Sequence, residues 1–149
     1  MSRVTVPLSP GVMPDRVFYA MADFMTWMGT EVPKLKTGRL QASQTPQEQL
    51  DAILLNWTAG KPMAYSRAMN DLMPGRDEVW EMKTPDLRIF GWICLPRTFV
   101  AVFGDYADWY KRPTIKKSYG DARERVISAR HALNLDEPKI ATGVYDALV

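Results

Sequence analysis

Residues 79–103 read VWEMKTPDLRIFGWICLPRTFVAVF, and this stretch decides the fold. It holds three apolar runs, Val79–Lys83, Leu87–Leu95 and Phe99–Phe103, which are rich in the Val, Ile, Phe and Trp residues that favour strands. A proline stands at the second position of each intervening four-residue turn, where its fixed φ is favourable. The stretch therefore predicts an antiparallel meander of three strands.

The middle run is expected to be a central strand. Successive side chains of a strand point to opposite faces. One face would carry Leu87, Ile89, Gly91 and Ile93, and the other Arg88, Phe90, Trp92 and Cys94. Both sets are largely apolar, so both faces of this strand should be covered. A charged arginine in such a strand requires either a partner or a function.

Upstream of the meander, the first expected elements are a strand and a helix. Arg3–Leu8 alternates valine with threonine and is predicted to be a short strand, which Pro7 confines to an edge or ends. Asp15–Met28 is predicted to be a helix capped by its first residue. Its apolar stripe has helical spacing and consists of Phe18, Met21, Met25 and Met28.

The clearest helix start lies at Thr45, which begins a capping box and precedes a proline at the first helical position. This helix is expected to end at Gly60. A loop over Glu31–Ser43 precedes it, and a short helical turn is expected within Ala64–Leu72. The apolar face of the helix consists of Leu50, Ile53, Leu54 and Trp57.

Downstream of the meander, Gly104–Tyr110 is too polar to continue the last strand and too aromatic for a simple linker. Ser118 is expected to cap a final helix that runs from Tyr119 to about Asn134. A tail follows from about residue 135. Three apolar residues are expected to dock this tail: Val144, Tyr145 and Leu148.

The predicted fold class is α+β. A small antiparallel sheet, made of the N-terminal strand and the three-stranded meander, would pack against two N-terminal helices and a C-terminal helix. The 149 residues fit one domain, residues 1–149, and a hydrophobic content of 46% is sufficient for its core.

Charge is unevenly distributed along the chain. Residues 83–131 hold ten Lys/Arg and five Asp/Glu, a net charge of +5, whereas the whole chain carries +2, which leaves −3 for the remainder. A basic segment of this kind would suit a polyanion or an acidic partner. A solvated basic helix accounts for the same charge, and both interpretations stay open.

Cys94 and His131 are the only cysteine and histidine. Cys94 cannot form an intramolecular disulfide and is most simply a small core residue. One Cys and one His cannot form a metal site without several carboxylates, so we expect no metal and no cofactor. No apolar run reaches 18 residues, and the first residues lack the apolar core of a secretory signal. The chain is therefore expected to be cytoplasmic, without a membrane association.

Two groups of residues resemble a known pattern. The first is VWEMK at 79–83, followed after a tight turn by LRIF at 87–90. The second is YKR at 110–112, followed by YGDA at 119–122. With the order strand, helix, helix, three-stranded meander, helix, these motifs resemble the RelE/ParE-like toxin superfamily, including its HigB and phage branches. The resemblance extends from about Asp77 to Leu133.

The resemblance implies a RelE-like fold and the toxin of a toxin–antitoxin pair, with mRNA on the ribosome and a cognate antitoxin as partners. RelE-like members cut mRNA in the ribosomal A site without a metal, by attack of a ribose 2′-OH on the adjacent phosphate. The implied catalytic residues are Lys83 and Arg88 facing the phosphate, Lys111 or Arg112 as a second clamp, and Tyr119 for proton transfer or stacking. The residues implied to bind RNA are Trp109, Tyr110, Lys116, Lys117 and Arg123.

Each implied residue also has a plain explanation. Arg88 would pair with Glu81 or Glu78 across the hairpin as an ordinary ion pair. The lysines would be solvated, and Tyr119 would pack as the first residue of an amphipathic helix. Asp105 and Asp108 would repel RNA from the basic site.

Three functional classes therefore stay open. The first is an endoribonuclease toxin. The second is a non-catalytic relative that binds nucleic acid or a protein partner, such as the DNA gyrase that ParE-like members target. The third is a structural subunit of a larger assembly.

Overall fold

Strand β5 (Leu87–Leu95) lies in the interior of the sheet and pairs antiparallel with β4 (Trp80–Lys83) and β6 (Thr98–Tyr106). The predicted meander is confirmed in a computed structural model that describes residues 1–73, 76–113, 115–133 and 140–149. The alternation predicted for β5 is also found. One hydrophobic cluster contains Leu87, Ile89 and Ile93, and the other contains Phe90, Trp92 and Cys94.

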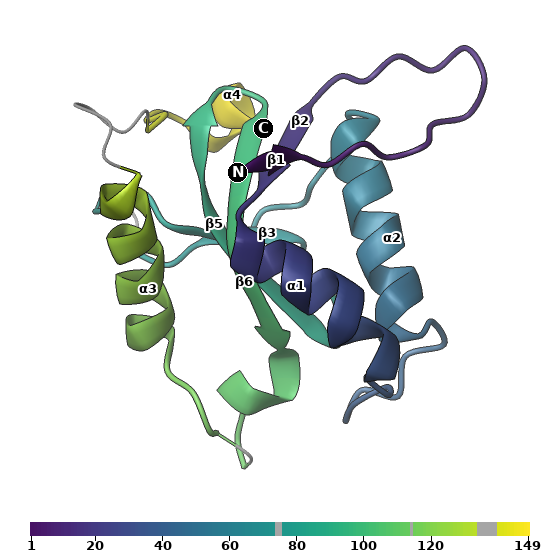
Figure 1. Ribbon diagram of the computed structural model, residues 1–149, viewed down its shortest axis with the longest axis vertical. Coiled ribbons are helices and arrows are strands. Elements are labelled where there is room, and N and C mark those ends of the chain that lie inside the picture. The colour runs from purple at the N-terminus through teal and green to yellow at the C-terminus, as the bar shows by residue number, and fades with distance from the viewer. Residues whose placement is uncertain (74–75, 114, 134–139) are drawn as a thin grey trace.

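The sheet is larger than expected and is mixed (Figure 1). Its strand order is β1-β2-β6-β5-β4-β3, with β1 (Ser2–Arg3) and β3 (Met69–Asp71) at the edges. Strand β2 (Val17–Ala20) pairs in parallel with β6. The prediction of a small antiparallel sheet is therefore wrong in this pair. Parallel neighbours need a long connection, and the residues between β2 and β6 provide one.

The segment predicted as the first helix differs most from expectation. Its first part forms β2, and helix α1 spans only Ala22–Thr30. Burial alternates along β2 as in a strand, because Phe18 and Ala20 are buried while Val17 and Tyr19 are half-buried. Asp15 caps no helix and forms an ion pair with Arg97. Of the strand expected at Arg3–Leu8, only Arg3 lies in a strand, as the second residue of β1.

Helix α2 (Pro46–Thr58) confirms the strongest local prediction. The Thr45 hydroxyl accepts a hydrogen bond from Glu48 N, and the Glu48 carboxylate accepts one from Thr45 N, which is the reciprocal pair of a capping box. Gly60 follows the helix with a φ of +72°. Between α1 and α2 the chain forms a short 3-10 helix, η1 (Val32–Lys34), and a loop.

Two shorter segments also differ from expectation. Residues 69–71 form β3, because they pair with β4, where a helical turn was predicted. Strand β6 continues to Tyr106 and is followed by the 3-10 helix η2 (Ala107–Tyr110). The polar residues of this segment were expected to end the strand. They remain in it because Asp105 is buried against partners described below.

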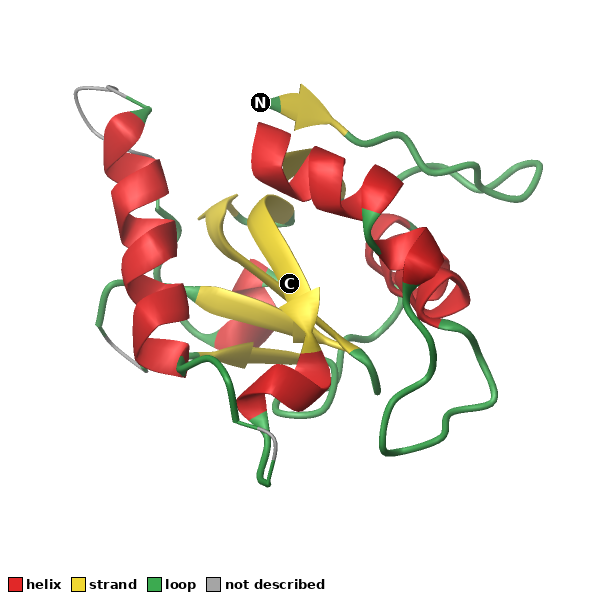
Figure 2. Cartoon of the chain, turned by 60° about the horizontal axis from the view of Figure 1, so that its bottom comes forward, coloured by secondary structure: helices red, strands yellow, loops and turns green. Residues whose placement is uncertain are grey.

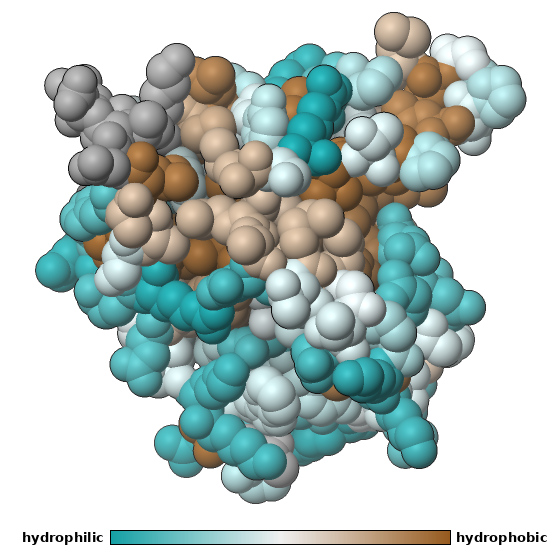
Figure 3. Space-filling view, in the orientation of Figure 1, coloured by the Kyte–Doolittle hydropathy of each residue, from teal (hydrophilic) through white to brown (hydrophobic). Residues whose placement is uncertain are grey.

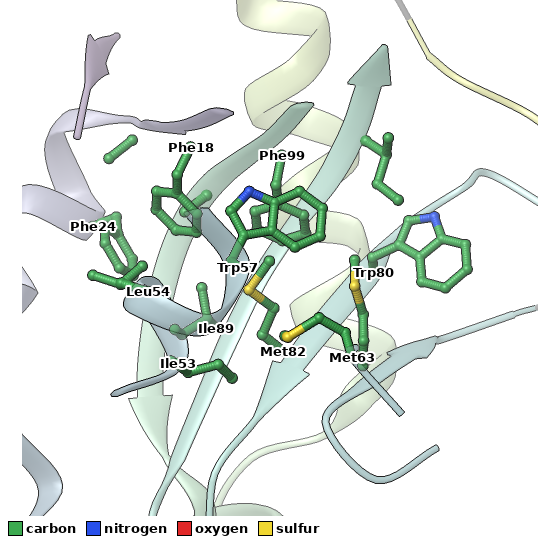
Figure 4. Close-up of a cluster of buried hydrophobic side chains, with 14 of the residues drawn as sticks. Phe18, Phe24, Ile53, Leu54, Trp57, Met63, Trp80, Met82, Ile89 and Phe99 are labelled. Carbon is green, nitrogen blue, oxygen red and sulfur yellow. The ribbon is translucent and has the colours of Figure 1, made fainter. Parts of the chain in front are cut away.

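Helices cover both faces of the sheet (Figure 2). On one side, α2 contributes Trp57 to a cluster with Phe18 of β2 and Phe99 of β6 (Figure 4). The Trp57 indole packs edge-on at 6.0 Å from Phe99 and donates a hydrogen bond of 3.0 Å to Val17 O. Buried aromatic side chains of this kind contribute a large apolar area, so they fix α2 on the sheet.

Helix α3 (Tyr119–Ala132) covers the opposite face through Ala122 and Val126. Its predicted cap is confirmed, because Ser118 Oγ accepts a hydrogen bond from Asp121 N at 3.0 Å. The predicted helix end near Asn134 and the predicted start of the tail near 135 lie outside the described residues.

The described part of the tail ends in α4 (Tyr145–Leu148). Leu148 is buried and the Tyr145 hydroxyl donates to Met63 O, whereas Val144 is exposed, so two of the three expected residues dock the tail. Within the described ranges, no helix has both the length and the apolar character needed to cross a membrane.

Candidate functional site

The residues singled out from the sequence lie mainly on the α3 side of the sheet, where β6 ends and the chain turns into α3 (Figure 1). The Cα atoms of Arg88 and Asp105 are direct partners in the β5–β6 register. Glu81 of β4 is the cross-strand partner of Phe90, which packs in the α3-side cluster. One charged layer of the sheet therefore lies next to the aromatic core beneath α3.

Arg88 is buried and held from several directions. Its Nη1 donates hydrogen bonds to Thr84 O at 2.7 Å and Leu87 O at 2.8 Å. Its Nε lies 3.6 Å from Glu81 Oε2 and 3.5 Å from the Tyr119 hydroxyl. The ion pair with Glu81, which was the plain explanation for this arginine, is therefore present. The contact with Tyr119 is present as well, although 31 positions separate the two residues.

Glu81 is the acidic residue that forms an ion pair with Arg88, and the sequence indicated it only as such a partner. The residue is 2% exposed, and burial raises the pKa of Glu81, while the charge of Arg88 acts to lower it. Its Oε1 lies 3.5 Å from the Asn70 amide. The sequence feature that could have predicted the burial of Glu81 is the register of the hairpin, because this register places Glu81 beside Phe90 on the covered face.

Tyr119 connects α3 to the sheet. Its ring packs against Tyr110 at 4.9 Å and Phe90 at 6.2 Å between centroids. The residue is nevertheless 37% exposed, so part of it is open to solvent while its hydroxyl contacts Arg88. A ligand at the surface can therefore reach this network directly through Tyr119.

The two carboxylates that were expected to repel RNA point into the molecule. Asp105 is buried, and its two oxygens accept hydrogen bonds from the Tyr110 hydroxyl at 2.5 Å and from Lys117 Nζ at 2.7 Å. Asp108 is also buried, and its Oδ2 accepts a hydrogen bond of 3.0 Å from Arg39 N. The charge of Asp105 is therefore paired with Lys117, and neither carboxylate is exposed at the surface.

The basic pair after β6 divides between two environments. Lys111 is half-buried, and burial lowers the pKa of its ammonium, with a further lowering from the nearby charge of Arg88. Arg112 is exposed, and its carbonyl accepts a hydrogen bond from the Arg39 side chain. The charge of Arg88 therefore acts on Lys111, whereas Arg112 points to solvent.

The residues implied to bind RNA are less uniform. Trp109 is half-buried with the Lys117 ammonium 4.7 Å above its ring. Tyr110 is 8% exposed and is packed between other rings, so it offers little surface for a base. Lys116 is exposed. Arg123 forms ion pairs with Asp77 and Glu124.

The structure therefore brings two implied residues, Arg88 and Tyr119, into contact, and Lys111 lies within electrostatic range of Arg88. Lys83 is a direct cross-strand neighbour of Arg88, but its Nζ donates to Ser66 O. A cavity of about 260 Å³ lies between Asp105, Lys117 and the first turn of α3, and Arg88, Lys111 and Tyr119 are not among its described lining residues. Figure 3 shows hydrophilic residues gathered over the lower part of the molecule, where these segments lie.

No group of three or more His, Cys, Asp or Glu residues that could hold a metal ion occurs among the residues that the structure describes. A scan against protein-family models, a search of curated proteins and a search of solved structures each found no match to this chain.

Proposed function

We propose that this chain is the toxin of a toxin–antitoxin pair and a metal-independent endoribonuclease that cleaves mRNA on the ribosome. The resemblance of residues 77–133 to RelE-like toxins suggests the reaction. The observation that supports it most is the contact between the Arg88 guanidinium and the Tyr119 hydroxyl, with the charge of Arg88 also acting on Lys111.

The reaction needs three groups around one phosphate. The ribose 2′-OH loses its proton and attacks the adjacent phosphorus, the bond from phosphorus to the 5′ oxygen breaks, and that oxygen takes up a proton. The products carry a 2′,3′-cyclic phosphate and a 5′-hydroxyl. A base, a proton donor and fixed positive charge for the phosphorane are the corresponding requirements.

The three clustered residues match these requirements in type. The Arg88 guanidinium is held by two carbonyl oxygens and so requires no reorganisation to present its charge. Lys111 has a lowered pKa, so a larger share of its amine is neutral at a given pH and able to accept the 2′ proton. The partly exposed Tyr119 hydroxyl would donate the proton to the leaving oxygen.

A second function is favoured by the burial of Arg88. A buried arginine that pairs with Glu81 and two carbonyl groups is also what a purely structural residue looks like. In that case the chain is a non-catalytic relative whose exposed cations, such as Arg112 and Lys116, bind nucleic acid or an acidic partner.

Controlled expression separates the two functions. Induced expression of the toxin is expected to arrest the growth of the culture. Sequencing of RNA ends should then find new 5′-hydroxyl ends inside coding regions. Co-expression of the gene adjacent to this one should restore growth if it encodes the antitoxin. Unchanged growth together with intact mRNA in cells and on purified ribosomes would favour the non-catalytic relative.

A further inference from the structure

A second cavity lies away from the candidate site, beneath the N-terminal arm (residues 3–7). Its volume is about 270 Å³, and Phe18 of the α2-side core is among its lining residues. The arm is held over it by a hydrogen bond of 2.9 Å from Val4 N to Phe18 O. Small-molecule sites are usually about 300–1,000 Å³, so this cavity has room for a small ligand.

Arg16 is a buried cation in the wall of this cavity. It is 7% exposed, its Nη1 donates a hydrogen bond of 2.7 Å to Lys61 O, and its guanidinium lies 5.1 Å from the centre of the Trp57 ring. Its Nε has no hydrogen-bond partner among the described residues. Burial lowers the pKa of Arg16, which the charge of Asp15 opposes.

Thr58 provides a second unsatisfied group in the same wall. It is 6% exposed, and its hydroxyl has no hydrogen-bond partner in the described part of the chain. Buried polar atoms without protein partners are rare, and a bound ion can satisfy them. The two residues that carry these atoms both line the cavity, which favours a ligand with hydrogen-bond acceptors.

The charge of the lining indicates the sign of that ligand. Arg3 and Thr5 also line the cavity, and no Asp or Glu is among its described lining residues. The acid next in sequence, Asp15, is already paired with Arg97 at 2.8 Å. Two arginines and two hydroxyls without a carboxylate match an anion.

We propose that this cavity binds a small oxyanion, a phosphate or carboxylate group, through Arg16 and Thr58. The site is independent of the proposed ribonuclease, because it lies on the α2 side of the sheet and shares no residue with the cluster beneath α3. The bound anion would supply the negative charge that the buried guanidinium lacks.

A titration with inorganic phosphate tests the site. Amide chemical shifts of the ¹⁵N-labelled protein are followed at constant ionic strength, with chloride as the balancing ion. We expect saturable shifts at Val4, Val17 and Thr58. Thr58→Val keeps the shape of the side chain and leaves the contacts of Arg16 with Lys61 O and Trp57 in place. It should weaken phosphate binding about tenfold or more. Arg67→Gln removes a charge from an exposed position outside the cavity, and it should leave binding unchanged.

A parallel titration with acetate distinguishes the two oxyanion sources, because the tighter of the two saturable ligands identifies the group. Shifts that stay linear with both anions, or equal affinity in the wild type and in Thr58→Val, would overturn the proposal. Shifts confined to the basic segment 111–118 would do the same. If the Arg16→Met variant folds, it provides a further check, because it should abolish saturable binding.

Discussion

Arg88 and Glu81 face each other beneath α3, with Nε 3.6 Å from Oε2 and less than a tenth of either side chain exposed. Breaking such a buried pair from one side leaves an uncompensated charge. Arg88→Met is therefore expected to lower the free energy of unfolding by about 3–5 kcal/mol, measured by urea denaturation. The double variant Glu81→Leu with Arg88→Met should recover most of this loss. Equal stabilities of the single and double variants would show that the two charges are not coupled.

Tyr119→Phe is the sharper test of catalysis, because it removes only the hydroxyl and keeps the ring packed on Tyr110 and Phe90. We expect cleavage of ribosome-bound mRNA to slow by about 10²–10³-fold, as for other lost transition-state contacts. The melting temperature should stay close to that of the wild type. Tyr65→Phe, at an exposed tyrosine bonded to Asp71, is the matched control and should cleave normally. Full activity of Tyr119→Phe would remove this residue from the mechanism.

The raised pKa of Glu81 predicts a pH dependence of stability. Burial raises the folded-state pKa above its ordinary 4.5, so the folded protein keeps this proton at a pH where the unfolded chain has released it. The contribution of Glu81 to the free energy of unfolding is therefore fully present below about pH 4.5 and declines as pH rises through the folded-state pKa. Glu81→Gln should lack this decline, so its stability relative to the wild type should rise with pH. Urea denaturation of both proteins across that pH window checks the sign, and a pH-independent difference would contradict it.

Metal removal gives a test of the proposed chemistry. Cleavage by the purified protein should persist in EDTA, because the proposed proton transfers and charge stabilisation use only Lys111, Arg88 and Tyr119. Because ribosomes need magnesium, the assay uses ribosome-bound mRNA with free magnesium held in excess of EDTA, so that EDTA removes transition metals and leaves the ribosome intact. Loss of activity in EDTA, followed by recovery with a divalent ion, would show that this scheme is wrong.

The Gln49 side chain holds the turn before β5 in place with four hydrogen bonds, two donated by its amide nitrogen and two accepted by its oxygen. Its amide nitrogen donates to Gln44 O and Asp86 Oδ2, and its oxygen accepts from the Thr84 hydroxyl and Asp86 N. Gln49→Leu would leave the buried Oδ2 and the backbone N–H of Asp86 without these partners, at about 1–3 kcal/mol for each group, while Asp86 Oδ1 keeps its hydrogen bond from Gly38 N. Gln47→Leu, on the same helix, should change stability by about 0.5 kcal/mol or less. Thermal denaturation of both variants compares them, and similar melting temperatures would contradict the anchoring role.

The meander was predictable because its information is local. Three β-rich runs are contiguous, and short proline turns join them. Strand β2 was not, because its four residues also fit helical spacing and its partner, residues 98–101, lies far away in sequence. The local pattern of residues 17–20 fits both a helix and a strand, and the pairing with β6 is what makes this segment a strand.

The candidate site was predictable only in part. Arg88 stood out as a charge in an apolar strand, whereas Tyr119 was implied only by the resemblance of residues 110–112 and 119–122 to RelE-like toxins. The partners of the other side chains depend on distant segments. Asp77 holds Arg123 and Ser66 accepts from Lys83, and neither contact has a signal in local spacing.

The parallel pairing of β2 with β6 has a consequence for synthesis of the chain. Val17 pairs with Thr98, a partner on the order of 80 residues later, so contacts of this kind close slowly. A nascent chain exposes β2 without a partner until β6 has left the ribosome. The six-stranded sheet can therefore form completely only after residues 98–106 have been translated and have left the ribosome. Hydrogen-exchange pulse labelling during refolding should find the amides of residues 17–20 protected among the last, and early protection there would contradict this order.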